Sequence, residues 1–436
     1  MSLDQLKQGL FCLTAILQGL RLYPAEHPQI RKQLASSVST LGKLINEYEK
    51  LTIGLLDGTL LLNNIPCLDQ LPALQELSRL LARQRLQAVE ISAGVDNRQL
   101  LFFCRQLPQL QGGDFADRLE DAGVTAIQVS RQDEEVEGAE TVYKRALAAV
   151  EDVCNDVRLG QIPASRQVIK TVKGMVRTII EEPFALLAMS MLKDYDNYTF
   201  SHSVNVSVIA MSVGKACGLS NQKLYELGLG GLLHDLGKMT IDHDIVVKPG
   251  KLNTREYELM KQHPVNGAKI VADMERIPLE VIDIVNNHHL GYDRSGYPAS
   301  NRGQSVSPLA DMTCIADTYD AITTMRCYQR PRSPKQAIAK MAKLSGSRLH
   351  PEYLARFLEY LGPYPVGTMV RLQDGRVGLI SDQNQQGLGS LTLKILFDAT
   401  GAKMAEPPLQ QLSDGHSIVA EVDPTLKGVR LEDYLP

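Results

Sequence analysis

The segment GLGGLLHDLGKM, residues 228–239, joins an apolar, glycine-rich helical run to a short polar motif. His234 and Asp235 follow the run directly, and Lys238 lies three residues beyond Asp235, on the same face of a helix. Adjacent helical residues diverge by about 100°, so His234 and Asp235 reach one site only if that site is wedged beside the helix. The segment therefore predicts a helical domain with polar chemistry inside it.

An acidic residue with a cationic neighbour is the arrangement that a metal site acting on a phosphate requires. The carboxylate of Asp235 would bind the metal, and the ammonium of Lys238 would meet the charge that develops on the phosphoryl oxygens. The alternative is a surface His-Asp pair with a salt bridge to Lys238. That alternative fits poorly beside the closely packed glycines and leucines of the run.

Histidines are concentrated in the same part of the chain, since six of the nine fall between positions 202 and 289. His263 stands in MKQHPVNG, and His288 and His289 stand together in NNHHLGYDRSGYP. Asp317 ends an apolar run in CIADTYDAIT, where a buried carboxylate would be costly without a counter-charge such as a metal. Imidazoles suit iron, zinc, copper or nickel, and carboxylates let manganese compete.

Seven motifs, in this order, resemble the HD-GYP domain, a branch of the HD phosphohydrolase superfamily specialised for cyclic di-GMP. They are HxxxV at His202, LLHDLGK at 232–238, KPGKL at 248–252, His263, the His288-His289 pair, SGYP at 295–298 and IADTYDA at 315–321.

The resemblance implies two divalent metal ions held by seven side chains: His202, His234, Asp235 and Asp317 for one ion, and His263, His288 and His289 for the other, with Asp235 bridging both. It further implies Asp235 and Lys238 as catalytic residues and a metal-bridging hydroxide as the nucleophile. Iron is expected first and manganese second, because the ligands are mostly imidazoles. Asp320 is predicted to orient a ligand, with a structural salt bridge as the alternative.

Some family members bind a third metal through a Glu four residues before the first histidine. Tyr198 occupies that position here, so a binuclear site is predicted.

The substrate is expected to contact Lys238, Tyr297, Arg326 and Arg294. Three departures from the family pattern lie near these residues: Leu290 replaces a Glu, Arg294 replaces a Gly, and Gln329 replaces a basic residue. None removes a metal ligand, but each can change how a substrate fits around Tyr297. Arg294 or Arg330 is hypothesised to supply the missing charge.

The remaining histidines receive ordinary interpretations. His243, His350 and His416 match no ligand position and are predicted to be surface or local-structure residues. His27 precedes Pro28 and is predicted to lie at a turn or to cap a helix. The seven cysteines are scattered without a CxxC motif, which is typical of reduced thiols.

At 436 residues, with 44% hydrophobic and 22% charged residues, the chain is predicted to be multidomain. Four segments are expected: a small α+β regulatory or dimerising module over 1–135, a helical linker over 136–182, the all-α HD-GYP domain over 183–363, and a small all-β, barrel-like module over 364–436. In the first, apolar periodicity predicts helices over 6–22 and 30–51, and LTIGLLDGTLLLNN predicts a hairpin with Asp57-Gly58 at its turn.

The net charge of −4 gives no general attraction to a nucleic acid polymer. The N-terminus does not have the pattern of a signal peptide, and no stretch is long and apolar enough to span a bilayer, so a soluble cytoplasmic protein is expected.

The leading hypothesis is a metal-dependent phosphodiesterase that hydrolyses cyclic di-GMP to pGpG, to GMP, or to both. One alternative is a catalytically weak sensor of cyclic di-GMP or an interaction protein, which the altered loop residues favour somewhat. Another is a related hydrolase acting on a different nucleotide. Homodimerisation and binding of signalling partner proteins are further hypotheses.

Overall fold

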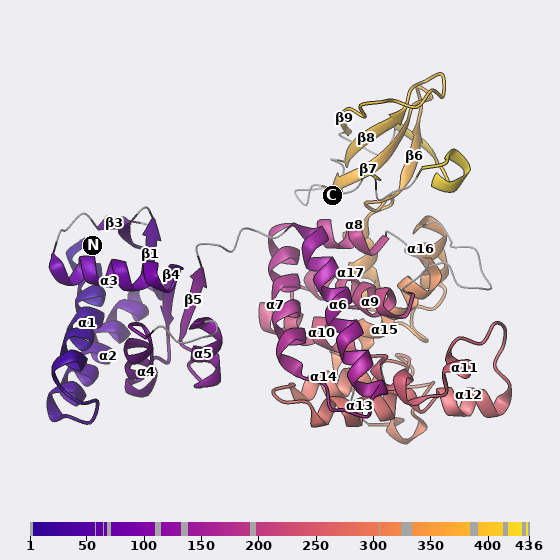
Figure 1. Ribbon diagram of the computed structural model, residues 1–436. Coiled ribbons are helices and arrows are strands. Elements are labelled where there is room, and N and C mark those ends of the chain that lie inside the picture. Colours follow the sequence, from indigo (N-terminus) through magenta and orange to yellow (C-terminus); the bar gives the residue numbers. More distant parts are fainter. Residues whose placement is uncertain are drawn as a thin grey trace. The chain divides into compact units, whose positions relative to one another are not determined.

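The computed structural model describes residues 3–56, 58–63, 65–67, 71–109, 115–131, 138–191, 198–304, 306–323, 334–383, 391–412, 417–429 and 433–434. The chain forms two compact units, Met1–Val136 and Glu137–Pro436. The central part is helical, and small β-sheets lie in the N-terminal and C-terminal parts (Figure 1). This layout agrees with the predicted order of segments. No helix in the described ranges is long and apolar enough to cross a membrane.

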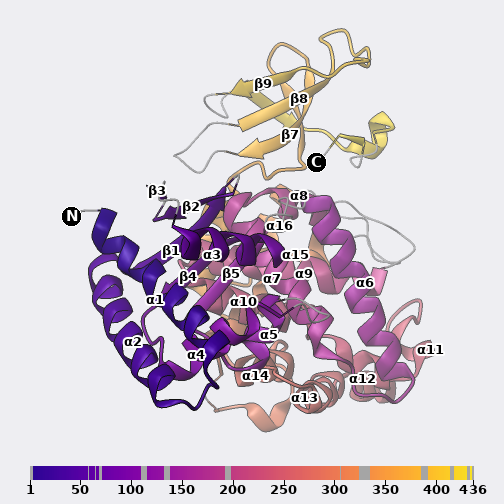
Figure 2. The same ribbon diagram turned by 60° about the vertical axis from the view of Figure 1, so that its left-hand side comes forward.

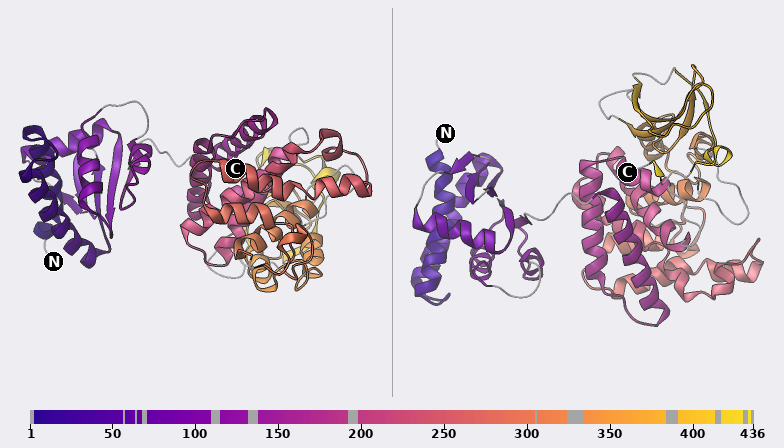
Figure 3. Two further views of the ribbon diagram at one scale, coloured as in Figure 1. Left: turned by 90° about the horizontal axis from the view of Figure 1, so that it is seen from below. Right: turned by 45° about the horizontal axis from the view of Figure 1, so that its top comes forward.

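In its described residues the first unit forms an antiparallel five-stranded sheet of order β3-β2-β1-β4-β5, covered by helices (Figure 3). Its elements are α1 (Leu3–Leu22), α2 (Pro28–Tyr48), β1 (Lys50–Leu56), β2 (Thr59–Leu62), β3 (Ile65–Cys67), α3 (Pro72–Arg83), β4 (Leu86–Ser92), α4 (Asn97–Gln106), α5 (Phe115–Asp121) and β5 (Ile127–Arg131).

Two local predictions in this unit are confirmed and one is corrected. His27 caps α2 by accepting a hydrogen bond from the amide of Gln29, and β1 pairs with β2 in the predicted hairpin. The helix predicted over 30–51 ends earlier, at Tyr48. Glu49 adopts a left-handed φ of 66°, which breaks the helix and lets β1 begin. Asp57 of the predicted turn lies outside the described residues.

The described part of the second unit begins with the helices α6 (Ala139–Arg158), α7 (Ser165–Glu181), α8 (Ala185–Met191), α9 (Tyr198–Ala216), α10 (Asn221–Leu233), α11 (His243–Val246), α12 (Thr254–Met260), α13 (His263–Asp273), α14 (Leu279–Asn287), α15 (Pro308–Thr323), α16 (Pro334–Ala342) and α17 (Pro351–Leu361). The helices α6 and α7, which fall in the predicted linker, contribute buried side chains to the same apolar cluster as the helices that follow. They are therefore part of the compact unit (Figure 2).

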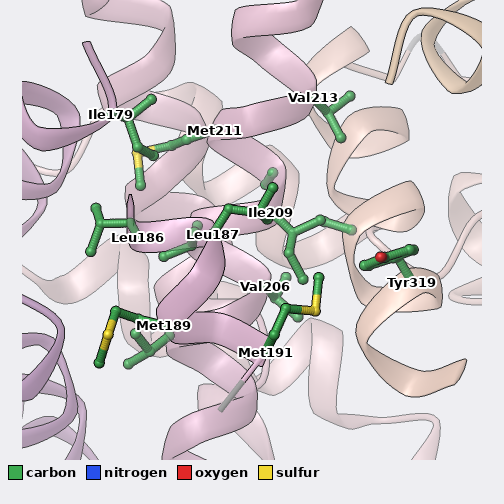
Figure 4. Packing of buried hydrophobic residues seen from close by; sticks show 14 of the residues in the cluster. Ile179, Leu186, Leu187, Met189, Met191, Val206, Ile209, Met211, Val213 and Tyr319 are labelled. Atoms are coloured by element: carbon green, nitrogen blue, oxygen red, sulfur yellow. The ribbon is translucent and has the colours of Figure 1, made fainter. Parts of the chain in front are cut away.

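The centre of this unit is occupied by α9 and α15, which are apolar around most of their circumference. Figure 4 shows side chains of α7, α8 and α9 packed together, with Tyr319 of α15 beside them. A helix that is apolar on all sides belongs in a core. Consequently, the polar residues on these two helices are buried too, among them His202, Asp317 and Asp320. Such residues need partners, and they form the candidate site.

The helices α11 and α12 form an arm that contributes no buried residue and projects from the other helices (Figure 1). The KPGKL motif lies between them. Lys248 forms an ion pair with Glu256, and Asn253 caps α12 in a capping box with the same glutamate. Local polar contacts thus order this arm in place of burial.

The C-terminal sheet is antiparallel, with strand order β10-β6-β7-β8-β9. Its strands are β6 (Met369–Leu372), β7 (Val377–Gln383), β8 (Leu391–Phe397), β9 (Leu409–Leu412) and β10 (Ile418–Glu421). Among the described residues β9 and β10 form its two edges, so these strands make an open sheet and not the predicted barrel-like closure. Its apolar side chains join the helical cluster, and Gln383 Nε2 donates to the carbonyls of Leu361 and Tyr364.

Candidate metal centre

The HD motif stands where α10 ends. The helix stops at Leu233, His234 caps it, and Asp235 already has a non-helical backbone. Both residues thus follow the helical run, as the sequence indicated. The change of chain direction brings both side chains to one place, with 3.3 Å between His234 Nε2 and Asp235 Oδ2. Lys238 follows in the short 3-10 helix η1 (Leu236–Thr240), and its Nζ donates to Asp235 Oδ2.

Gly237 allows η1 to approach α13 more closely than any side chain permits. A Cβ at this position would lie 1.9 Å from the carbonyl oxygen of His263 and 2.5 Å from the amide nitrogen of Gly267. This close contact places Asp235 beside the first residue of α13, with 3.2 Å between Asp235 Oδ1 and His263 Nε2. The close backbone contact thus explains why the HDLGK motif has a glycine at position 237.

Three histidines are oriented by the backbone of their own helix or turn. In each, Nδ1 donates over 2.8 Å to the carbonyl oxygen three residues earlier: His234 to Gly231, His263 to Met260 and His288 to Val285. Because a carbonyl can only accept, Nδ1 of each ring carries a proton, and in the neutral form of the ring the lone pair is then on Nε2. This is the tautomer that metal-ligating histidines adopt.

The predicted ligands gather in two groups, and within each group the ligand atoms lie within 4.8 Å of one another. The groups are Asp235 with His263, His288 and His289, and His202 with His234 and Asp317. Asp235 Oδ2 also lies 3.4 Å from His202 Nε2. The structure therefore brings all seven predicted side chains together, with Asp235 between the two groups.

The donor atoms of this cluster fit a divalent cation. His263 Nε2 and His288 Nε2 are 3.3 Å apart, although both carry lone pairs. His234 Nε2 and Asp235 Oδ1 are buried without a hydrogen-bond partner in the described part of the chain. Buried polar atoms are rarely left unsatisfied, and opposed lone pairs repel. Cations between these atoms would remove both problems, so the residues present suit divalent metal binding.

Electrostatics keeps most of these ligands in the protonation state that binds a metal. Burial raises the pKa of Asp235, but His234 and Lys238 outweigh it and hold that pKa well below its usual range. Burial lowers the pKa of His263, and burial with neighbouring imidazoles lowers those of His288 and His289 further. The carboxylate is therefore charged and these three imidazoles are neutral.

His202 behaves differently because two carboxylates face it. Burial alone would lower its pKa, but hydrogen bonds with Asp235 and Asp320 raise the pKa to about 9. A metal ion at this imidazole would consequently displace a proton.

Behind His202 lies a hydrogen-bonded network that reaches α6. His202 Nδ1 lies 2.7 Å from Asp320 Oδ2, and Asn205 Nδ2 donates over 3.0 Å to Asp320 Oδ1. Tyr143 of α6 donates over 2.6 Å to Asn205 Oδ1. Asp320 thus has the position expected of a residue that orients a ligand. Sequence reasoning missed Asn205 and Tyr143. Asn205 could have been predicted, because it lies three residues after His202, whereas no sequence pattern pointed to Tyr143.

The SGYP loop lies against the second group of ligands. The ring of Tyr297 is 4.6 Å from that of His289. Gly296 has a φ of 102°, and a Cβ there would lie 2.2 Å from the carbonyl oxygen of His289. Leu290 is buried and pairs with Gly296 in an isolated β-bridge. Among the predicted substrate contacts, Tyr297 and Lys238 therefore border the cluster.

Arg294 is occupied by a different partner from the one predicted. Its guanidinium makes two hydrogen bonds, of 2.7 and 3.1 Å, with the buried carboxylate of Asp311. Its φ of 59° lies in the left-handed region, where the family's glycine would be unstrained. The arginine therefore serves the structure of the loop. Arg326, Gln329 and Arg330 lie outside the described residues, as does the side chain of Tyr198.

His350 and His243 are local-structure or surface residues, as predicted. His350 caps α17 and stacks on Tyr353, and His243 is an exposed residue at the start of α11. His416 lies outside the described residues.

Comparison with known proteins gives a family for the central part of the chain. Residues 187–353 match the HD domain family. Over 267 residues the chain is 36% identical to cyclic di-GMP phosphodiesterase PA4108 of Pseudomonas aeruginosa. The matched region covers 61% of this chain and 64% of that protein. Over 173 residues it is 31% identical to a cyclic di-GMP phosphodiesterase of Thermotoga maritima, covering 39% of this chain and 47% of that protein.

A third relative carries a different substrate in its name. The chain is 32% identical over 145 residues to 3'3'-cGAMP-specific phosphodiesterase 1 of Vibrio cholerae, covering 33% of each protein. The chain thus spans less than two thirds of the length of each of these relatives.

Helical fold, ligand cluster and family match together define the class: the central domain of this chain is an HD domain. The paired histidines and the SGYP loop beside them are the features in which it resembles the HD-GYP branch of that superfamily.

Proposed function

We propose that the HD domain is a phosphodiesterase that hydrolyses cyclic di-GMP to pGpG, to GMP, or to both. The observation that carries this proposal is the pair of ligand groups with Asp235 between them. Two relatives, 36% and 31% identical in the matched regions, are named cyclic di-GMP phosphodiesterases.

The seven side chains of the cluster would hold two divalent ions. Bound there, such ions would lower the pKa of a water and polarise the phosphodiester. Iron is the first candidate and manganese the second, because five of the seven ligands are imidazoles and two are carboxylates.

Around the ions, the protein's own side chains orient ligands and meet substrate charge. Asp320 and the helix carbonyls hold the histidine rings. The side chain of Lys238 is 24% exposed, so its ammonium can turn from Asp235 to a non-bridging phosphate oxygen. Tyr297 borders the same space and is proposed to contact the substrate. Arg326 is retained as a contact on family resemblance alone, and Arg294 is not included because Asp311 binds it.

A second candidate substrate is another cyclic dinucleotide, 3'3'-cGAMP. One relative is named for this substrate, and the loop beside Tyr297 departs from the family pattern at Leu290 and Arg294. These departures alter the loop and leave the ligands intact, so they would change substrate preference and not the chemistry.

The experiment is to load anaerobically purified protein with Fe(II) or Mn(II) and to follow cyclic di-GMP and 3'3'-cGAMP by chromatography. Asp235→Ala is run beside the wild type. Product from cyclic di-GMP with the wild type and none with the mutant supports the proposal. Product from 3'3'-cGAMP alone favours the second candidate. If protein shown to carry two metal ions forms product from neither dinucleotide, both candidate substrates are overturned.

We also propose that residues 1–135 regulate or dimerise the hydrolase, that residues 136–182 connect them to the HD-GYP domain over 183–363, and that residues 364–436 form an accessory module. Homodimerisation and signalling protein partners belong to this proposal. A monomeric mass by light scattering would remove the dimer.

A further inference from the structure

A continuous chain of buried hydrogen bonds runs from α6 to a proposed metal ligand. The hydroxyl of Tyr143 donates to Asn205 Oδ1 over 2.6 Å, Asn205 Nδ2 donates to Asp320 Oδ1 over 3.0 Å, and His202 Nδ1 lies 2.7 Å from Asp320 Oδ2. The four residues come from α6, α9 and α15 and are between 1% and 6% exposed. Water therefore does not replace these bonds readily.

The polarity of these bonds is set by the carboxylate of Asp320, which can only accept. An Asn side chain has a donor end and an acceptor end that exchange when the amide rotates. Asp320 therefore fixes the Nδ2 end of Asn205 toward itself, and Oδ1 is left to accept from the hydroxyl of Tyr143. The opposite rotamer would set an amide oxygen against that carboxylate, which is repulsive. Tyr143 thus anchors the other end of the Asn205 amide in the orientation that holds Asp320, and Asp320 holds the ring of His202.

We propose that Tyr143 is a positioning residue of the metal centre. Through Asn205 and Asp320 it keeps His202 oriented toward the ion that it shares with His234 and Asp317. The inference rests on the proposed metal centre, and it does not depend on which cyclic dinucleotide is hydrolysed.

The location of Tyr143 also connects this chain of hydrogen bonds to the start of α6. The helix α6 begins at Ala139, immediately after the boundary between the two compact units. Tyr143 lies near its start and links this helix to the hydrogen bonds of His202. A displacement of the start of α6 would therefore be transmitted to one of the two ligand groups and spare the other.

The test is the binding of Mn(II) to the full-length Tyr143→Phe protein, measured by calorimetry and by metal analysis after gel filtration. Partners that orient a metal ligand typically contribute about 10–100-fold in metal affinity. We expect one of two ions to bind about 10–100-fold more weakly and the other to bind as in the wild type. Asn205→Ala should weaken the same ion, and the double variant should lose little more than either single one.

A matched control is available on α15. Tyr319 is a fully buried tyrosine between Asp317 and Asp320, and its hydroxyl has no hydrogen-bond partner among the described residues. Tyr319→Phe removes the same atom without touching the chain of hydrogen bonds, so it should bind both ions like the wild type. Circular dichroism and thermal melting establish that each variant is folded.

Three outcomes would overturn the proposal. The first is wild-type affinity for both ions in folded Tyr143→Phe. The second is an equal weakening of both ions, since His202 belongs to only one ligand group. The third is additive losses in the double variant, which would show that Tyr143 and Asn205 act separately.

Discussion

At the scale of single residues, the candidate metal centre requires glycines at two positions in addition to its proposed ligands. Gly237 lets η1 lie against the start of α13, and Gly296 lets the SGYP loop lie against the carbonyl of His289. In both places the atom that a Cβ would meet belongs to the backbone of a proposed metal ligand. Neither contact can be relieved by turning a side chain, so these positions tolerate substitution poorly.

Gly237→Ala is expected to disrupt the centre. The new methyl would overlap the His263 carbonyl, so α13 must move away from Asp235, at a cost of about 3 kcal/mol in the free energy of unfolding. Chemical denaturation and metal analysis check this. Gly174→Ala in α7 is the control, because a Cβ there meets nothing within 4 Å. It should be neutral or stabilise by up to about 1 kcal/mol. Two ions bound to Gly237→Ala at full stability would contradict the prediction.

The histidines predict a pH dependence for the metal-free protein. The pKa values of His263, His288 and His289 are lowered from 6.5, so the unfolded chain binds more protons and stability falls as the pH drops below about 6.5. The pKa of His202 is raised to about 9, so its contribution, complete below 6.5, is lost as the pH rises through about 9.

The melting temperature in the presence of a chelator should therefore peak near pH 6.5 and fall on both sides of it. Differential scanning calorimetry across that range measures it. A melting temperature that rises steadily from acid to alkaline pH would contradict the sign assigned to His202.

At the scale of elements, the SGYP loop is held by contacts with the segment before α17 and with α15. The amides of Tyr292 and Asp293 donate to the carbonyls of Arg348 and Ser347, and Arg294 binds Asp311. The loop that carries Tyr297 is therefore fastened by the residues just before the SGYP motif. An arginine replaces the family's glycine at the cost of a strained φ and gains a bidentate ion pair.

Arg294→Gly should destabilise the protein although glycine relieves the backbone. Removing the half-buried Arg294 leaves the buried carboxylate of Asp311 unpaired, at a cost of about 3 kcal/mol, and relief of the left-handed φ returns about 1 kcal/mol, for a net loss of about 2 kcal/mol. Adding Asp311→Ala removes the unpaired carboxylate and should recover part of the loss. Urea denaturation of the wild type, Arg294→Gly and the double variant measures these differences in stability. A single variant as stable as the wild type would show that the ion pair contributes nothing.

Some features of the helices, strands and candidate site could be predicted from the sequence alone, and others could not. The seven ligand positions and their grouping were expected from ordered motifs, and the strands at both ends were expected from alternating patterns and Asp-Gly turns. The non-helical backbone of Asp235 was not, because an apolar run carries no signal for the direction that the chain takes after it. Nor was the link through Tyr143, since a contact between α6 and α9 has no local signature.

At the scale of the whole molecule, the two units differ in how their sheets are supported. The sheet of the first unit has its own apolar cluster. The C-terminal sheet shares a cluster with the HD domain, in which Phe357 and Leu361 of α17 join Val366, Met369 and other residues of the sheet. The first unit is therefore separable, whereas the C-terminal sheet is part of the fold that carries the metal centre.

Two truncations follow from this difference. The fragment 137–436 should fold and bind two metal ions like the full chain, since its cluster is complete. Ending the chain after residue 363 should give an insoluble or molten protein, because the apolar face of α17 would be exposed to water. Size-exclusion chromatography, circular dichroism and metal analysis test both. A soluble, cooperatively melting fragment 137–363 would contradict the shared core.

The backbone hydrogen bonds of His234, His263 and His288 have a consequence for how the protein acquires its ions. These rings are oriented by carbonyls of their own segments, so the cage exists before any cation enters it. Uptake and release then need no refolding, and occupancy follows the supply and escape of ions over the lifetime of the protein. If the proposed ions bind there, a chain that matures without its divalent cation would be loaded later, and the same polypeptide would pass through differently loaded forms.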